Sequence, residues 1–558
     1  MPDREPPQPI LLTNTEPSIV LVQYDRFTKA ISLVCAYFLK MTANPSLFQR
    51  LTKGDLSIIF YLSLFKLIVH LAMNISGGYG LFRDEFYYVA CANNLAAGYV
   101  DHPPLSAFIL RVMIEVFGDS LFSIRLMAAL TGALTIFFTG LITLRLGGGK
   151  LATFIACLLC FSPINMAMTG FYSMNSIDIL CWTLVAYLLI LIIQQEKSKW
   201  WIVLGIVLGL GLLNKIGVLF LGAGLFAGLL ATSQRKWFLT RWPYVTGMIA
   251  LFCFLPYIVW NFQNSFAHLE FIRNASSEKY ASQTAMDFLA GQFMMNNPVS
   301  ILVWLPGLIA LFTTEYFKLY RLLAWLYVVP LFIFVVNGTS KSEYLAPAYG
   351  MLYASGAIFW ERQIWKSMVY KYALTAVMGF WVVLALVALP VVLPVLPVEK
   401  YISYAEAIGF EPDSSEGKDL SELPQFYADM FGWKEKAKGV AEVFNTLSAE
   451  EKQKVAIFSS NYGRCAAIDY YGDEYGLPKT IGDHNNYWIW GPRDYDGEIL
   501  ILLGGDIEEH KPDFREVELV SVIDCKYCMP YEDNVPVYIC RGLKHKPEEV
   551  WPAVKHYD

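Results

Sequence analysis

A series of long apolar runs limits what this chain can fold into. Eleven such runs lie between Leu56 and Pro397, and none contains more than one Asp, Glu, Lys or Arg. A helix needs about 20 apolar residues to cross a bilayer, because it rises about 1.5 Å per residue. Hydrophobic residues make up 55% of the chain and charged residues 16%, with a mean hydropathy of +0.41, which excludes an ordinary soluble protein.

The sequence therefore predicts an α-helical polytopic membrane protein with about 11 transmembrane helices. The predicted spans are residues 56–75, 121–144, 151–169, 176–193, 200–214, 216–232, 243–260, 298–313, 322–337, 344–360 and 372–397.

The first 55 residues precede the first predicted span and are expected to form a cytoplasmic N-terminal segment. Met1–Pro17 is polar and rich in proline, and no charged and then apolar stretch with a small-residue cleavage site follows it. We therefore expect no secretory signal and a mature protein that keeps its start. The apolar run Ile31–Leu39, bounded by Lys29 and Lys40, is too short to span a bilayer and predicts an interfacial segment.

Basic residues occupy the N-terminal segment and every second connection between the predicted spans, as cytoplasmic loops do. They are Arg26, Lys29, Lys40, Arg50, Lys53, Arg145, Lys150, Lys197, Lys199, Arg235, Lys236, Arg241, Lys318, Arg321, Arg362, Lys366 and Lys371. This alternation predicts a cytoplasmic N-terminus and, after an odd number of spans, an extracytoplasmic C-terminal domain. Four polar segments then lie outside, where we expect the chemistry: residues 77–120, 170–175, 261–297 and 337–343.

The composition changes near Glu399. From there on the chain has 31 acidic and 17 basic residues, a net charge of −14, whereas the preceding residues carry a net charge of +8. Strand-like runs and one amphipathic helical stretch follow, at residues 455–459, 499–503, 517–523, 535–540 and 433–447. We expect a transmembrane catalytic domain over residues 56–397 and a soluble extracytoplasmic α/β domain over residues 398–558. The net charge of −6 over the whole chain argues against a nucleic-acid partner.

The first outer segment is the most unusual part of the sequence. It contains the runs Arg83–Tyr88 and Gly98–Leu105, within helical stretches expected at residues 84–97 and 104–116 that lie along the membrane surface. Adjacent helical residues point about 100° apart, so we expect only one of Asp84 and Glu85 to act while the other orients it.

Asp84 and Asp101 are 17 residues apart, roughly 25 Å on a straight helix, so they share a site only if the chain reverses at Ala97–Gly98. The alternative is that these acids are solvated caps of interfacial helices, with Asp84 at the N-cap or first position.

Further ionisable residues lie at the predicted outer ends of spans. Asp178 lies in the opening turn of an apolar span. An acid at this position either faces a polar cavity or is stabilised by the helix dipole. Lys215 lies at the junction of two short spans, where anion binding and snorkelling explain it equally well. Arg273 and Lys341 are candidates for phosphate contacts, or else solvated loop charges.

The order of these motifs resembles a known family. Asp84-Glu85-x-Tyr87-Tyr88, Gly98-Tyr99-x-Asp101-His102-Pro103-Pro104-Leu105, Asp178 and Asn214-Lys215 are similar to motifs of membrane glycosyltransferases of the GT-C fold. The resemblance is strongest to the family 39 group of protein mannosyltransferase-like enzymes and their aminoarabinose-transferase relatives, and it runs from about Leu56 to Tyr349.

This resemblance implies transfer of a sugar from a polyprenyl-phosphate-linked donor to a hydroxyl of a lipid, glycan or protein. By position, Asp84 matches the acid expected as general base or metal-assisting group, and Asp178 matches a second acid. Lys215 matches a basic residue near the donor phosphate, and Lys341-x-x-Tyr344 resembles a Lys- and Tyr-containing motif that opens a late span. Aminoarabinose transferases carry Glu-Lys-Pro where this chain has Asp101-His102-Pro103. The residues expected to contact the donor therefore differ from those of that group.

The chemistry of such a transfer suits these residues. A lipid phosphate is a stable leaving anion, so the site needs a base for the incoming hydroxyl and positive charge for the phosphate. The predicted catalytic carboxylates are Asp84, Glu85 and Asp178. The predicted contacts for the donor and its phosphate are Arg83, Asp101, His102, Lys215, Arg273, Lys341 and Tyr344. A direct displacement would invert the anomeric carbon. His102 could relay a proton or bind a divalent metal, or be an ordinary hydrogen-bonding residue; no other cofactor is expected.

Two features of the C-terminal part leave alternatives open. Cys525-x-x-Cys528 suggests a disulfide in an oxidising compartment, or a metal site together with Cys540, and Cys465 lies in the same part. Residues 462–464 and 483–492 are rich in side chains that bind sugars, although a packed core with surface turns explains them more simply.

Two other functions remain possible from the sequence. A transporter or flippase of an amphiphilic substrate would use the acids and Lys215 as a path, but transporters bind near the midplane and these residues gather at one face. A non-catalytic homologue would use its outer domain only as a scaffold in the cell envelope.

Overall fold

The computed structural model describes residues 54, 56–76, 78–279, 283–338, 340–411 and 416–558. Most of the predicted N-terminal segment, including the predicted interfacial run Ile31–Leu39, lies outside the described residues. The chain divides into two compact units at Tyr61, and Leu62–Asp558 form the second unit, which holds every predicted site residue.

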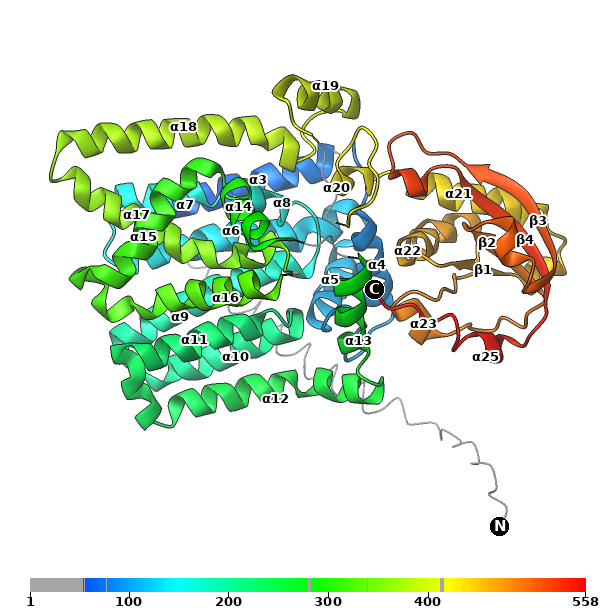
Figure 1. Cartoon of the computed structure of the whole chain (residues 1–558), viewed down its shortest axis with the longest axis horizontal. Helices are drawn as coiled ribbons and strands as arrows, with labels where there is room; N and C mark the ends of the chain where they lie inside the picture. Colours follow the sequence, from blue (N-terminus) through cyan, green and yellow to red (C-terminus); the bar gives the residue numbers. More distant parts are fainter. Residues whose placement is uncertain (1–53, 55, 77, 280–282, 339, 412–415) are drawn as a thin grey trace, which may run out of the picture. The chain divides into compact units, whose positions relative to one another are not determined.

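Helices occupy all of the predicted spans (Figure 1). They are α3 (Leu56–Ser76), α6 (Leu121–Arg145), α7 (Lys150–Leu159), α9 (Met174–Gln195), α10 (Ser198–Asn214), α11 (Val218–Ala231), α12 (Trp242–Gln263), α15 (Ile301–Thr313), α16 (Leu322–Asn337), α17 (Tyr349–Ile364) and α18 (Met368–Val392).

The described helices confirm an integral membrane protein. Five of them, α3, α6, α9, α12 and α18, are long and apolar enough to cross a membrane. Two bent pairs would raise the number to seven: α11 with η1 (Ser233–Leu239), and α14 (Ala285–Met294) with the η3–α15 helix (Pro298–Thr313). The helices α7, α10 and α16 are apolar but shorter. The count of eleven spans stays a prediction.

The predicted span 151–169 is interrupted. Helix α7 ends at Leu159, and a separate short helix, α8 (Pro163–Ala167), follows it. Pro163 is the first residue of α8, where its missing N–H is not needed, and Ser162 before it has left the helical conformation (φ −57°, ψ 151°).

Helices α6 and α9 form the centre of the helical part. Their most apolar windows are 61% and 72% buried, against 22% for α12 and 6% for α18. Because α12 and α18 present so much apolar surface outward, they require lipid around them.

Helices α15 and α17 approach each other closely at two glycines. A Cβ atom at Gly356 would overlap Val303 O, and one at Gly307 would overlap the backbone of Gly356. Membrane helices associate through van der Waals packing, which small residues allow by bringing the backbones together.

A four-stranded sheet lies in the C-terminal part, with strand order β1-β2-β4-β3. Its strands are β1 (Ala456–Ser459), β2 (Ile499–Leu503), β3 (Phe514–Ile523) and β4 (Val535–Leu543), which overlap the four predicted strand runs. β1 and β2 are parallel, with Ile457 opposite Ile501, and the other pairs are antiparallel.

Helices α21 (Trp433–Thr446) and α22 (Tyr462–Tyr471) pack on this sheet (Figure 1). The amphipathic stretch predicted at residues 433–447 is thus a helix, and its Val440 and Phe444 join Ile501 and Val537 in one apolar core. Cys525 and Cys528 form a disulfide, while Cys465 and Cys540 are buried free thiols, so the alternative of a metal site with Cys540 is wrong.

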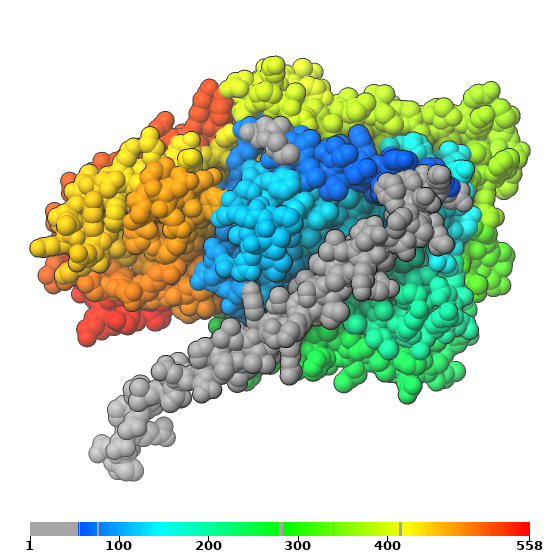
Figure 2. Space-filling view, turned by 180° about the vertical axis from the view of Figure 1, so that it is seen from behind, coloured from blue at the N-terminus to red at the C-terminus, as the bar shows by residue number. Residues whose placement is uncertain are grey.

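The first outer segment forms α4 (Arg83–Asn93) and α5 (Leu105–Phe117), close to the predicted helical stretches. Helix α22 packs against α4, and Figure 2 shows the orange surface of this C-terminal segment adjoining the blue surface of the first outer segment. Two elements that are more than 300 positions apart in the chain therefore build one surface.

The approach of α15 to α17 predicts that Gly356→Ala destabilises the protein by about 1–3 kcal/mol, because the added methyl group overpacks a backbone contact. The measurement is thermal unfolding of the purified chain in detergent. Gly379→Ala in α18 is the matched control, because a Cβ there meets nothing within 4 Å. Equal melting of the two variants would contradict the close packing.

Candidate active site

The side chain of Glu85, in the first turn of helix α4, caps the start of that helix. Phe82 is extended (φ −70°, ψ 147°), and its N–H donates to Glu85 Oε2 over 2.8 Å. Asp84 is the second residue of the helix, so the alternative that Asp84 is its N-cap or first residue is wrong. An acid near a helix N-terminus is still stabilised by the helix dipole.

Glu85 is fully buried in an ion pair with Arg125 of α6. Arg125 Nη2 lies 2.6 Å from Glu85 Oε2, and the backbone N–H of Tyr172 donates to Oε1 over 2.7 Å. With Phe82 as a further donor, both carboxylate oxygens are engaged. Glu85 is thus buried and fully bonded, which suits the orienting role expected for one acid of the Asp84–Glu85 pair, and its place among the catalytic acids stays a prediction.

Arg83 binds acids of the C-terminal part. Its guanidinium lies 2.8 Å from Glu416 and 3.5 Å from Asp429, and it donates to the hydroxyl of Tyr531 over 3.0 Å. Burial alone would lower the pKa of Arg83, but the carboxylates, Asp429 first, outweigh it and raise the pKa. The positive charge of Arg83 is therefore already paired with carboxylates, and its contact with the donor phosphate stays a prediction.

Asp429 is almost completely buried beside Arg83. Burial raises the pKa of Asp429 to about 7, although Arg83 opposes the shift. The Arg83 N–H also donates to Asp429 O over 3.0 Å, so this residue holds the start of α4 through its backbone as well.

Asp84 is the more exposed acid of the pair. Its side chain is 39% exposed, and Oδ1 accepts from the hydroxyl of Tyr462 over 2.8 Å and from Arg83 Nε over 3.4 Å. Tyr462 begins α22, so the C-terminal part contributes directly to this site.

Asp101 lies next to the same group of aromatic rings. The hydroxyl of Tyr87 donates to Asp101 Oδ1 over 3.1 Å, and the rings of Tyr87 and Tyr462 are 4.9 Å apart. The chain does reverse between the two helices, with the Tyr99 hydroxyl donating to Cys91 O over 2.9 Å. Gly98 is needed there because a Cβ would lie 2.7 Å from the Trp260 ring.

His102 is enclosed by these rings. It is fully buried and stacks on Tyr88 at 4.7 Å, and its Nδ1 donates to Pro103 O over 2.8 Å. Within the described ranges, the one group of three or more metal-ligating side chains close enough to share an ion does not include His102. The His102 ring is therefore enclosed by its neighbours, and its contact with the donor stays a prediction.

A second group of predicted residues meets where α9 begins and α10 ends. Lys215 Nζ lies 3.8 Å from Asp178 Oδ2 and donates to Asn175 Oδ1 over 2.7 Å. It also lies 5.0 Å from the centre of the Tyr344 ring. The Lys215 side chain is 14% exposed and that of Asp178 only 4%, so this is a largely buried cation with one close acid.

The local sequence places each member of this second group. Lys215 follows α10 in an extended conformation (φ −153°, ψ 128°), and Asn214 Nδ2 holds that end by donating to Met174 O. Tyr344 lies in η5 (Ser342–Ala348), which begins directly after Lys341, and its N–H donates to Lys341 O over 3.0 Å.

The two groups are connected through α4. Tyr88 lies one helical turn after Asp84, and its hydroxyl accepts from the N–H of Met174 over 3.3 Å. Met174 precedes Asn175, which binds Lys215. Asp84 and the Lys215–Asp178 pair are therefore linked through one turn of α4, the Met174–Tyr88 hydrogen bond and the contact between Asn175 and Lys215.

Arg273 lies apart from this path. It is exposed on α13 (Ala267–Asn274), whose Glu270 pairs with Lys555 and whose Asn274 donates to Tyr557 O. The contact of Arg273 with the donor phosphate stays a prediction. The partners of its neighbours Glu270 and Asn274 could not be foreseen from the sequence, because Lys555 and Tyr557 come from the far end of the chain.

Sequence reasoning missed Arg125 and Asn175. The signal for Arg125 was present, because it is the single charged residue within the apolar run 121–144 and such residues need a partner. Asn175 gave no signal, since its role depends on the end of α10 approaching the start of α9.

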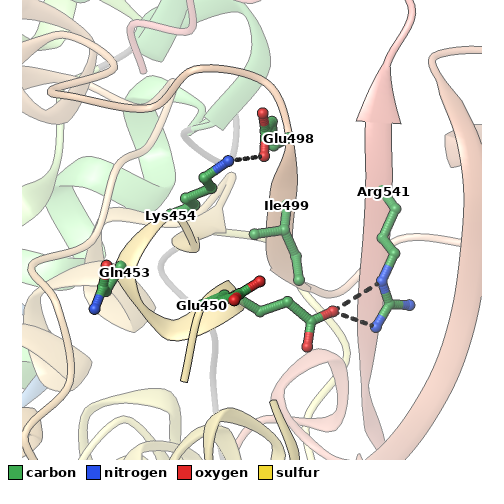
Figure 3. A pocket seen from close by; sticks show the side chains of 7 residues that line it. Glu450, Gln453, Lys454, Glu498, Ile499 and Arg541 are labelled. Atoms are coloured by element: carbon green, nitrogen blue, oxygen red, sulfur yellow. Dashed lines mark hydrogen bonds and ion pairs between the residues drawn. The ribbon is translucent and has the colours of Figure 1, made fainter. Parts of the chain in front are cut away.

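A surface pocket in the C-terminal part is separate from these residues. It is lined by Glu450, Glu451, Gln453, Lys454, Glu498, Ile499 and Arg541 (Figure 3). Its charges pair with one another, Lys454 with Glu498 over 2.6 Å and Arg541 with Glu451 over 3.1 Å. None of the predicted site residues lines it.

Comparisons with known proteins support the expected resemblance. Residues 101–260 match the family model described as dolichyl-phosphate-mannose-protein mannosyltransferase. A curated relative, the lipid A galacturonosyltransferase RgtD of Rhizobium johnstonii, is 24% identical over 271 residues, which are 47% of this chain. The match spans about half of that relative, 56% of its length.

Solved structures share the fold. ArnT from Cupriavidus metallidurans bound to undecaprenyl phosphate superposes with a TM-score of 0.58 at 14% identity, over 86% of this chain and 97% of that one. The apo state of the same protein gives a TM-score of 0.57. The resemblance to GT-C membrane glycosyltransferases is thereby confirmed. Because the sequence identity to these solved structures is so low, the superpositions show a shared fold and nothing about activity.

The buried pair of Glu85 and Arg125 predicts that Glu85→Gln destabilises the protein by about 3–5 kcal/mol, because Arg125 would remain buried without its carboxylate. The measurement is thermal unfolding in detergent together with the yield of monodisperse protein. Glu115→Gln is the control, since Glu115 is an exposed acid of the same outer segment whose partner among the described residues is Arg111. Unchanged melting of Glu85→Gln would show that the pair is not essential to the fold.

Proposed function

We propose that the protein is a glycosyltransferase that moves a sugar from a polyprenyl-phosphate-linked donor to an acceptor hydroxyl on the extracytoplasmic side. The observation that supports this proposal is that an exposed carboxylate, Asp84, and a largely buried cation, Lys215, are linked through helix α4 and the start of α9. It lies in a fold shared with ArnT, which was crystallised with undecaprenyl phosphate. A base and a cation are the two groups that such a transfer requires.

Asp84 is the proposed base for the acceptor hydroxyl. Both of its described contacts, from Tyr462 and Arg83, are made to Oδ1. No described residue donates to Oδ2, and this oxygen is the one that would accept the proton of the acceptor. Tyr462 fixes the orientation of the carboxylate, and orientation of a base is a large part of its effect.

Lys215 is the proposed contact for the donor phosphate, with Tyr344 beside it and Lys341 at the start of the same turn. A cation in a poorly solvated place interacts strongly with an anion. Asp178 and Asn175 orient the ammonium group, and the 3.8 Å separation from Asp178 is longer than a hydrogen bond, so in this proposal a phosphate oxygen binds the same group. Asp101, hydrogen-bonded to Tyr87, would face the sugar between the two ends.

Transfer explains the distribution of charge better than transport does. Asp178 lies in the first turns of α9 and Lys215 just after the last turn of α10, so both are at helix ends. A single displacement by the acceptor hydroxyl would invert the anomeric carbon. In this proposal residues 56–397 hold the donor, residues 398–558 face the extracytoplasmic side with Tyr462, and the N-terminus is cytoplasmic.

Replacement of the base tests the proposal directly. Asp84→Asn should lower the rate of sugar transfer by about 10²- to 10⁴-fold, because the amide cannot accept the proton. The measurement is release of polyprenyl phosphate from a lipid-linked sugar in membranes that contain equal amounts of folded protein. Glu115→Gln should transfer at the wild-type rate. Wild-type turnover by Asp84→Asn would remove Asp84 from this role.

Removal of the cation tests the donor site. Lys215→Met should lower kcat/KM for the lipid-linked donor by about 10²- to 10³-fold, because the leaving phosphate loses its stabilising charge. Lys215→Arg should recover part of this loss. The control is Lys197→Met at the opposite end of the same helix, which is exposed. If both Met variants behaved alike, the phosphate would have to bind elsewhere.

A further inference from the structure

Two histidines and an aspartate meet in the C-terminal part. His484, His556 and Asp558 offer ligand atoms that all lie within 4.8 Å of one another. His484 Nε2 is 2.7 Å from Asp558 Oδ1, and His556 Nε2 is 3.2 Å from Asp558 Oδ2. The two imidazole rings are stacked 4.6 Å apart.

The backbone holds these side chains together independently of any ion. His484 and His556 form a parallel β-bridge, in which Asn485 N–H donates to His556 O and His556 N–H donates to Asp483 O. The bonds are 2.8 and 3.0 Å long. The two ligands are therefore brought side by side by main-chain geometry, so little ordering would remain to be done on binding a metal.

The donor set suits zinc. Two imidazole nitrogens and one carboxylate oxygen with an open fourth position form a common three-ligand zinc site. Zinc bonds of about 2.0–2.1 Å in a tetrahedron place ligand atoms about 3.3 Å apart. The two His–Asp separations of 2.7 and 3.2 Å are close to this value, and all three ligand atoms lie within 4.8 Å of one another. The His556 side chain is 45% exposed, which gives an ion access from solvent.

A second carboxylate strengthens the case. Asp483 precedes His484 and is nine-tenths buried, and it interacts electrostatically with both His556 and Asp558. Its Oδ1 is buried and accepts no hydrogen bond from the described residues. Asp483 is not one of the three candidate ligands, and a buried carboxylate beside them would add negative charge near a bound cation.

We propose that His484, His556 and Asp558 form a zinc site that fastens the C-terminal residues 551–558 to the loop before α23 (Asn486–Trp490). The site adjoins the residue that orients Asp84, because the His484 ring packs 4.8 Å from the Tyr462 ring. Zinc binding would therefore stiffen the position of Tyr462. The inference concerns metal binding and does not rest on the proposed transfer reaction.

The experiment is a zinc titration of the full chain in detergent after removal of metal with a chelator. The wild-type protein should bind one more equivalent of Zn²⁺ than His556→Gln and Asp558→Asn, as measured by elemental mass spectrometry after desalting. Loss of one ligand should weaken this site by about tenfold or more in competition with a fluorescent chelator. Zinc should also raise the melting temperature of the wild-type protein more than that of either variant.

His545→Ala is the matched control, because His545 is an exposed histidine of the same part of the chain. It should bind Zn²⁺ as the wild type does. His556 is half-exposed and Asp558→Asn nearly preserves shape, so both variants are expected to fold, which circular dichroism checks. Equal zinc stoichiometry and affinity in the wild type, His556→Gln and Asp558→Asn would overturn the proposal, as would a wild-type protein that binds no zinc.

Discussion

The buried ion pair between Glu85 and Arg125 determines where the candidate active site lies. Three parts of the chain meet at Glu85: the start of α4, helix α6 through Arg125, and the segment before α9 through the N–H of Tyr172. Two buried charges cost free energy unless their hydrogen bonds are satisfied. In this pair the hydrogen bonds are satisfied, since Arg125 also donates to Gly80 O. The ion pair therefore fixes the orientation of α4 relative to the helical part.

That orientation explains why one acid of the Asp84–Glu85 pair is inside and the other outside. Adjacent residues on a helix point about 100° apart, so a helix held by Glu85 must present Asp84 to a different side. Tyr88, one turn further, then reaches the start of α9, and Asp84 reaches Tyr462. The positions of the proposed base and of the path to Lys215 both follow from this one anchor.

Much of the helical part could be predicted, because apolar length is a local property of the sequence. The ranges of α9 and α18, the helices of the first outer segment and the strands β2 and β4 all follow from it or from residue periodicity. The ion pair that Arg83 forms could not be predicted, since its partner Glu416 is 333 positions away. Asp178 and Lys215 were found because a charge in an apolar run is conspicuous, whereas Asn175, an ordinary polar residue, was not.

The C-terminal part completes the site through a second set of buried charges. Glu532 lies between Lys436, at 3.3 Å, and Arg464, at 2.9 Å; burial would raise its pKa, but these cations outweigh burial and lower it. Arg464 belongs to α22 and donates to Tyr531 O, while the Tyr531 hydroxyl accepts from Arg83. The same helix therefore carries Tyr462 to Asp84 and is tied back to α4 through Tyr531. Because both connections reach neighbouring residues of α4, movement of this part would change the orientation of the proposed base.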